Sequence, residues 1–132
     1  MIQTAAFQAS SGLNRDPALI PGNTRYGAEP HPDQICLSVT LCVARDASIG
    51  LVALTSASRG SPSVAFSRQM AMYLSHVGFG MSHAAIGRFF GRDRTTVLHA
   101  CHLVEDRRDD IWIDYRLAML ELACRIAIGE GR

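Results

Sequence analysis

The strongest constraint on this chain is the stretch SHAAIGRFFGRDRTTVLHA at residues 82–100, whose pattern predicts two short helices joined by a tight turn. Ser82 is a favourable N-cap, and the apolar residues after it recur at helical spacing. Gly91 ends the first helix, because glycine accepts the left-handed backbone that follows a helix C-terminus. Asp93 then caps the second helix, where its carboxylate meets the positive end of the helix dipole. This arrangement is typical of a helix-turn-helix.

The second of these helices has two distinct faces. Its inward face is predicted to consist of Val97, Ala100, Cys101 and Val104. Its outward tip carries Arg94, Thr95 and Thr96, side chains that suit the edges of DNA bases, since arginine pairs with guanine and threonine methyls contact thymine. Adjacent β-branched residues are poor helix formers, so base contact is favoured over the alternative that both threonines only support the cap.

Residues 92–100, RDRTTVLHA, resemble the signature of domain IV, the origin-binding domain of the bacterial replication initiator DnaA. The likeness extends upstream through SVA at 63–65, RQMAM at 68–72 and IG at 86–87, and it covers roughly residues 33–132. Where this family usually has histidine, the chain has Arg94, which adds length and charge. We therefore expect either a looser reading of the nine-base DnaA box or a preference for a variant of it. The resemblance implies an all-α fold, a small helical bundle containing the helix-turn-helix.

Contacts with duplex DNA are expected at particular positions. The resemblance implies base contacts by Asp93, Thr95 and Thr96 at the helix tip. We add Arg94, which lies among them although it differs from the family's histidine. Phosphate or minor-groove contacts are expected from a wider set: Arg59, Arg68, Gln69, His76, Ser82, Ala84, Arg88, Arg92 and His99. The family's matching loop is arginine-rich, whereas residues 55–63 keep only one arginine, which predicts fewer phosphate contacts and a shallower salt dependence.

The charge distribution favours the same region. With 13 Lys+Arg and 12 Asp+Glu, the net charge of +1 does not by itself predict a nucleic-acid partner. In residues 59–94, however, the only acidic residue is Asp93, whereas there are five arginines: Arg59, Arg68, Arg88, Arg92 and Arg94. Acidic residues dominate the segment that follows. Positive charge is therefore concentrated around the expected DNA-contacting helix, as phosphate binding requires.

Other functions lack a motif in the sequence. No G-x-x-x-x-G-K-[ST] loop is present, so we expect no ATP binding, and no nucleophile–base motif supports an enzyme. His99, Cys101 and His102 lack a fourth ligand at suitable spacing, so neither a metal nor another cofactor is expected. The four cysteines are expected to be free thiols. Without a signal sequence or a long apolar span, we expect a cytoplasmic, nucleoid-associated protein.

The chain divides into two predicted parts. Residues 1–32 are rich in proline and glycine and are expected to form a flexible N-terminal arm, and residues 33–132 form the DNA-binding domain. Besides the central pair, helices are expected at 33–44, in a short turn capped by Ser48, at 66–77, and from Asp109 or Asp110 to about 128. Val52 and Val77 are expected in the core.

The run Ile111–Trp112–Ile113 cannot all face inward on one helix. It forms either an irregular hinge packed on the core, which is favoured, or part of a contact surface.

The favoured function is sequence-specific binding to double-stranded DNA at DnaA-box-like sites, in regulation of chromosome replication initiation or of transcription. The alternative is a protein-interaction module that modulates the full-length DnaA initiator with weak or no DNA binding. The near-neutral charge and the loop with few cations favour the alternative, whereas the intact pair of threonines favours DNA binding.

Overall fold

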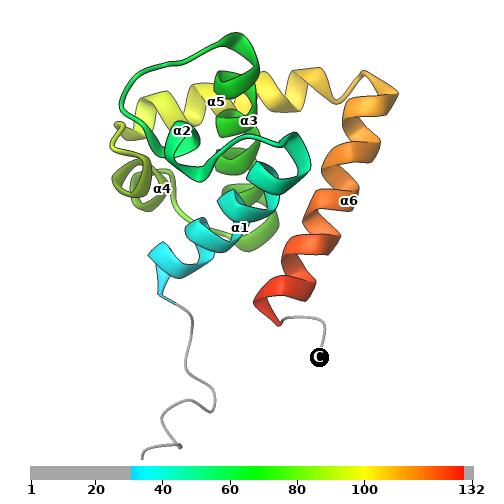
Figure 1. Ribbon diagram of the computed structural model, residues 1–132, viewed down its shortest axis with the longest axis horizontal. Helices are drawn as coiled ribbons and strands as arrows, with labels where there is room; N and C mark the ends of the chain where they lie inside the picture. The colour runs from blue at the N-terminus through cyan, green and yellow to red at the C-terminus, as the bar shows by residue number, and fades with distance from the viewer. Residues whose placement is uncertain (1–30, 130–132) are drawn as a thin grey trace, which may run out of the picture. The chain divides into compact units, whose positions relative to one another are not determined.

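In a computed structural model of the chain, residues 31–129 are described, and their regular structure is entirely helical, which confirms the expected all-α class. The elements, in order, are α1 (Pro32–Ala47), α2 (Leu51–Thr55), α3 (Pro62–Tyr73), the π-helical η3 (Leu74–Gly78), α4 (His83–Phe90), α5 (Arg94–Arg107) and α6 (Ile111–Ile128) (Figure 1). Residues 1–30 of the predicted arm lie outside the described residues. The last two residues assigned to the arm instead cap and begin α1.

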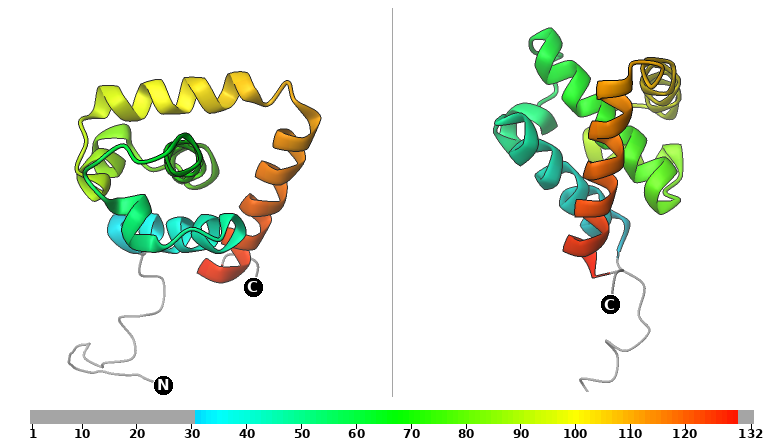
Figure 2. Two further views of the ribbon diagram at one scale, coloured as in Figure 1. Left: turned by 45° about the horizontal axis from the view of Figure 1, so that its top comes forward. Right: turned by 90° about the vertical axis from the view of Figure 1, so that its right-hand side faces the viewer.

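Helix α3 is the centre of the bundle. The left view of Figure 2 shows it nearly end-on, with α1, α4, α5 and α6 arranged around it. The side chains that it and η3 turn inward include Met70 and Leu74, which are fully buried. They meet apolar residues from the surrounding helices: Val39, Val43, Ile86, Phe90, Val97, Val104 and Leu117. One continuous core therefore holds the helix pair α4–α5 against α1 and α3.

The segment around the first loop differs from the prediction. Ser48 is not an N-cap; it is the left-handed C-cap of α1, with φ 57°, and Gly50 precedes α2. Because α2 has only five residues, it buries Leu54 alone and leaves Val52 exposed, so the expected core position of Val52 is wrong. Val77, also expected inside, is exposed at the end of η3.

Helix α3 begins four residues earlier than predicted. Ser61 is its N-cap and accepts a hydrogen bond from the main-chain N–H of Val64 at 3.2 Å, and Pro62 occupies the first helical position. Serine followed by proline is a strong helix start, since proline lacks the N–H that the first turn leaves unpaired. The connecting loop is therefore shorter than expected, and Arg68 lies inside α3 rather than at its start.

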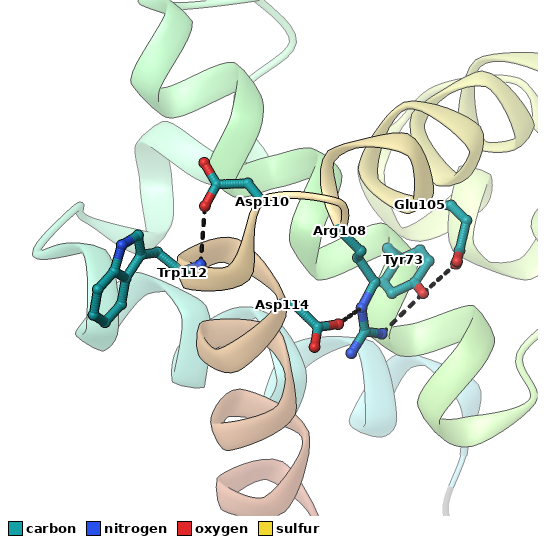
Figure 3. A network of polar contacts seen from close by, with 6 residues as sticks. All are labelled: Tyr73, Glu105, Arg108, Asp110, Trp112 and Asp114. Atoms are coloured by element: carbon teal, nitrogen blue, oxygen red, sulfur yellow. Dashed lines mark hydrogen bonds and ion pairs between the residues drawn. The ribbon is translucent and has the colours of Figure 1, made fainter.

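The junction of α5 and α6 is fixed by a polar network (Figure 3). The Tyr73 hydroxyl donates to Glu105 Oε1 at 2.5 Å and accepts from Arg108 at 3.1 Å. Arg108 Nε also donates to Asp114 Oδ1 at 2.6 Å, which links the interhelix turn to the first turn of α6. The N-cap of α6 is Asp110, whose side chain accepts a hydrogen bond from the main-chain N–H of Trp112 at 2.9 Å. The sequence predicted a start at either Asp109 or Asp110, and the second of these is confirmed.

The side chain of Trp112 points away from this network (Figure 3). Ile111 and Trp112 are both strongly exposed, so the favoured placement of this run against the core is wrong. The reason is helical geometry: the run lies in a regular first turn, where only Ile113 faces the bundle.

The four cysteines are free thiols, as expected. Burial raises the pKa of Cys36 and of Cys101 to about 11, so both stay protonated near neutral pH. Within residues 31–129, no helix has both the length and the apolar character needed to cross a membrane.

Candidate nucleic-acid interface

Helix α4 begins and ends, and helix α5 begins, where the sequence predicted. The Ser82 hydroxyl accepts from the N–H of Ala85 at 3.0 Å, and Gly91 ends α4 with φ 68°. The turn is compact because the N–H of Arg92 donates to the carbonyl of Gly87 at 2.8 Å. A Cβ at Gly87 would lie 2.4 Å from the carbonyl oxygen of Arg92, so only glycine allows this approach.

Helix α5 shows the two predicted faces. The inward residues are all buried: Val97, Ala100, Cys101 and Val104. The residues on its other side are exposed and lie along one surface: Arg94, Thr95, Thr96, Leu98, His99 and His102. The core contacts of one face therefore hold the other in a fixed direction, which is what a helix needs to enter a DNA groove.

The tip of α5 is organised by Asp93. Its Oδ1 accepts from the N–H of Thr96 at 2.9 Å and from the Thr96 hydroxyl at 3.1 Å. These hydrogen bonds to the charged form lower the pKa of Asp93, with a further contribution from the N–H of Thr95. The Thr96 hydroxyl thus has the capping role considered for it, while Arg94 and Thr95 project from the tip as exposed side chains.

A groove of about 390 Å³ lies beside this tip, between α3 and α5. It brings together six of the predicted contact residues: Arg59, Arg68, Gln69, Arg92, Thr96 and His99. They come from the loop before α3, from α3 itself, from the turn and from α5, so the fold assembles them from separate parts of the chain. The sequence resemblance suggested these positions one by one, and the structure places them around a single depression.

Arg68 is only 4% exposed, and its guanidinium is held by main-chain carbonyls. Nε donates to Leu54 O at 2.7 Å, and the terminal nitrogens donate to Arg59 O and Ala53 O, each at 3.0 Å. The prediction of a helix-start phosphate clamp is therefore wrong in its geometry, because this side chain lies within α3 and ties α2 and the loop to it. Burial, and then the charges of Arg92 and Arg59, lower its pKa.

Arg92 has a similar environment. Its guanidinium donates to Phe90 O at 2.8 Å and to the loop carbonyls of Ser58 and Ala57 at 3.2 and 3.4 Å. Carbonyl oxygens accept hydrogen bonds from Arg68 and Arg92 but carry no full negative charge, so they do not cancel the charges of the two guanidinium groups. The groove therefore keeps positive charge at fixed positions, as an anion-binding surface requires.

Four of the residues predicted to contact phosphates or the minor groove do not line this groove. Arg88 lines a different depression, with His31 and Asp33. His76 is half-buried: its Nδ1 lies 2.7 Å from Met81 O, and its ring stacks against His83 with centroids 4.0 Å apart. Ser82 and Ala84 are exposed at the start of α4. Their contacts with DNA stay predictions.

The apolar lining of the groove was missed in the sequence. It consists of Ala57, Ala65, Met72, Ala100 and Leu103. Two of them could have been predicted from helical spacing. Ala100 and Leu103 follow Thr96 by four and seven residues, so all three lie on one side of α5.

A buried inward face, a glycine turn and an exposed, cap-stabilised helix tip beside a cationic groove define a helix-turn-helix domain, a class whose second helix enters the major groove of DNA. The family model described as "Bacterial dnaA protein helix-turn-helix" matches residues 38–104. The chain belongs to this family.

The matched segment begins within α1, includes most of α5 and ends before α6. The chain is also similar to the chromosomal replication initiator protein DnaA of Bifidobacterium animalis subsp. lactis (strain AD011). The two are 47% identical over 49 residues, which make up 36% of this chain and 8% of that protein. The chain therefore spans less than a tenth of the length of this relative.

Proposed function

We propose that this chain binds double-stranded DNA sequence-specifically at DnaA-box-like sites and regulates chromosome replication initiation or transcription at the nucleoid. The observation that carries the proposal is the groove that joins Arg59, Arg92 and His99 to the tip of α5. Phosphates would lie along this groove while the tip enters the adjacent major groove. Membership of the family supports the same assignment.

Base reading is assigned first to Arg94 and Thr95. Both are exposed at the start of α5, and neither side chain is drawn into the cap as Thr96 is. A bidentate arginine–guanine pair discriminates against the wrong base by about 1–3 kcal/mol. Since Arg94 stands where the family usually has histidine, we expect the preferred site to favour guanine at the position that it contacts.

The test is equilibrium binding of the full chain to fluorescent duplexes carrying either a DnaA-box-like site or a scrambled site, over a salt series. Specific recognition should favour the first duplex by about 100-fold, a ratio below the roughly 10³–10⁷ typical of specific over non-specific binding. With three to four phosphate contacts, the log–log salt slope should be about −3 to −4. Arg94→Ala/Thr95→Ala should abolish the preference while leaving most of the salt dependence.

Arg116→Ala is the matched control, because this arginine lies on α6, paired with Asp46 and outside the groove. It should bind both duplexes as the unchanged protein does. Equal affinity for both duplexes in the unchanged protein would reduce the function to non-specific backbone binding. Absence of binding at low salt would overturn the proposal.

A second candidate is a module that modulates the full-length DnaA initiator with weak or no DNA binding. The net charge of +1, and the use of two groove arginines in internal hydrogen bonds, favour this alternative. It predicts that the chain co-sediments with full-length DnaA in the absence of DNA and that Arg94→Ala/Thr95→Ala leaves this association unchanged.

A further inference from the structure

Helix α6 has a second apolar stripe on the side that does not face the bundle. Its members are Trp112, Tyr115, Met119, Leu122 and Ile126, each between 46% and 77% exposed. They are spaced three, four, three and four residues apart, which is the a/d spacing of a coiled-coil seam. We call these five residues the outer seam.

The inner side of α6 is already occupied. Leu117, Leu120 and Cys124 are buried, and the helix packs there against α1 and η3. Figure 2 shows α6 at the edge of the bundle, and none of the other helices formed by residues 31–129 lies against its outer side. A helix with apolar side chains on both sides is expected where both sides are covered, and a continuous exposed stripe of this size marks an interaction site.

A groove of about 550 Å³ runs beside the outer seam, between α6 and α1. Tyr115, Met119 and Ile126 form part of its wall, so protruding side chains and a depression lie next to each other on one surface. A surface with both features can be complementary to a second copy of itself across a two-fold axis.

Two arginines near the outer seam are paired within the chain. Arg116 Nε lies 2.7 Å from Asp46, and Arg125 lies 2.9 Å from Glu121. These two ion pairs lower the net charge beside the apolar strip, so its central part does not repel a second copy of the chain.

The charges at the start of α6 set the direction of pairing. Asp109 and Asp110 are exposed there. In a parallel pair, these carboxylates and the equal ends of the two helix dipoles would lie together, which is unfavourable. An antiparallel pair separates the carboxylates and places the N-terminal end of each helix beside the C-terminal end of the other, where the opposite ends of the two dipoles attract.

The area is sufficient for association. Trp112 and Tyr115 alone expose large aromatic surfaces, and covering the outer seam on two copies would remove on the order of 1,000 Å² from water, where specific interfaces begin. We propose that the outer seam is the interface of a symmetric homodimer in which α6 packs antiparallel against α6 of a second copy. Trp112 then lies opposite the partner's Ile126, Tyr115 opposite the partner's Leu122, and Met119 opposite the partner's Met119. This inference does not depend on DNA binding.

The first test is sedimentation equilibrium of the full chain from about 1 μM to about 200 μM, a range suited to an interface of modest size. The mass should rise from that of one 14.3 kDa chain toward that of two. Leu122→Glu places a charge in the centre of the seam and should weaken dimerisation at least about 100-fold. Trp112→Ala should weaken it at least about 30-fold, as expected for an aromatic anchor.

Val52→Glu is the matched control, since Val52 is also an exposed apolar residue and lies on α2, away from α6. It should dimerise as the unchanged chain does. Circular dichroism of each variant confirms that the helices remain. A mass of one chain across the whole concentration range overturns the proposal, and so does equal weakening by Val52→Glu and Leu122→Glu.

The single tryptophan of the chain gives an independent readout. Because Trp112 lies in the outer seam, its fluorescence should shift to shorter wavelength as concentration rises and the ring leaves water. A blue-shifted spectrum that does not change on dilution, in a protein with the mass of one chain, would mean that the seam is covered by something other than a second copy.

Discussion

A single carboxylate oxygen of Asp93 accepts both the main-chain N–H and the side-chain hydroxyl of Thr96, at 2.9 and 3.1 Å. The residue expected to contact a base therefore also closes the first turn of α5. Structural and DNA-binding roles coincide at this position, and a variant that separates them is informative.

Asp93→Asn is that variant. Asparagine is as good an N-cap as aspartate, so the unfolding midpoint should change little at neutral pH. In acid, the two proteins should differ in stability. The pKa of Asp93 is lowered in the folded state, so the stabilisation by its carboxylate is present above the unfolded-state pKa and is lost as pH falls through the folded-state pKa. Thermal melts from about pH 7 to about pH 2 should show less acid destabilisation in Asp93→Asn.

Binding assays complete the separation. If the carboxylate contacts a base donor, Asp93→Asn should reduce the preference for the DnaA-box-like duplex while leaving the fold intact. An unchanged preference would assign Asp93 to capping alone.

Gly87→Ala should destabilise the domain by about 2 kcal/mol, because the new methyl group would collide with the carbonyl of Arg92 and force the turn apart. Urea unfolding followed by circular dichroism measures the change. Gly78→Ala is the matched control, since a Cβ there meets Glu121 at an ordinary 3.5 Å. Equal stability of both variants would show that the turn is more compliant than the geometry indicates.

Arg68→Met should destabilise by about 3 kcal/mol, since it leaves the carbonyls of Ala53, Leu54 and Arg59 without their donor. Hydrogen exchange should rise in residues 56–61, which this side chain ties to α3. Arg116→Met removes only a surface ion pair and should cost less than about 1 kcal/mol. Similar losses for the two variants would contradict a structural role for Arg68.

His83 should make the domain sensitive to mild acid. Its Nε2 is buried and has no hydrogen-bond partner among residues 31–129, and burial, followed by the charges of His76 and His102, lowers its pKa. A lowered pKa of a base means that the folded state resists protonation, so stability should fall as pH drops below about 6.5. His83→Phe keeps an aromatic ring beside His76 and should reduce the fall in melting temperature between about pH 7.5 and about pH 5.5.

His102→Asn is the comparison for this prediction, because His102 is exposed on α5. It should keep most of the pH dependence of the unchanged protein. A pH dependence that survives in His83→Phe would place the responsible group elsewhere.

The helix pair was predictable because its signals are local. Ser82, Gly91 and Asp93 each mark a helix end through their own backbone preferences, and all three act as expected. The start of α3 was missed although its signal is equally local, because Ser61–Pro62 was assigned to a loop rich in serine and glycine. Family resemblance supplied the candidate residues of the groove but not their arrangement.

Side-chain direction was harder to predict. Arg68 looks like a surface cation in the sequence, and only the meeting of α2, the loop and α3 shows that three carbonyls surround it. The exposure of Trp112 was likewise hidden, since hydrophobicity favours burial and the sequence does not reveal that α6 stands at the edge of the bundle.

The position of Arg92 has a consequence for how binding and local order depend on each other. Its guanidinium joins the end of α4 to the loop carbonyls of Ala57 and Ser58. A phosphate that breaks the hydrogen bonds from Arg92 to Ala57 and Ser58 makes the loop less ordered. A phosphate that binds Arg92 while these hydrogen bonds remain makes the same loop more ordered. Occupancy of the groove and motion of the loop that carries Arg59 are therefore linked equilibria, and each can be followed through the other.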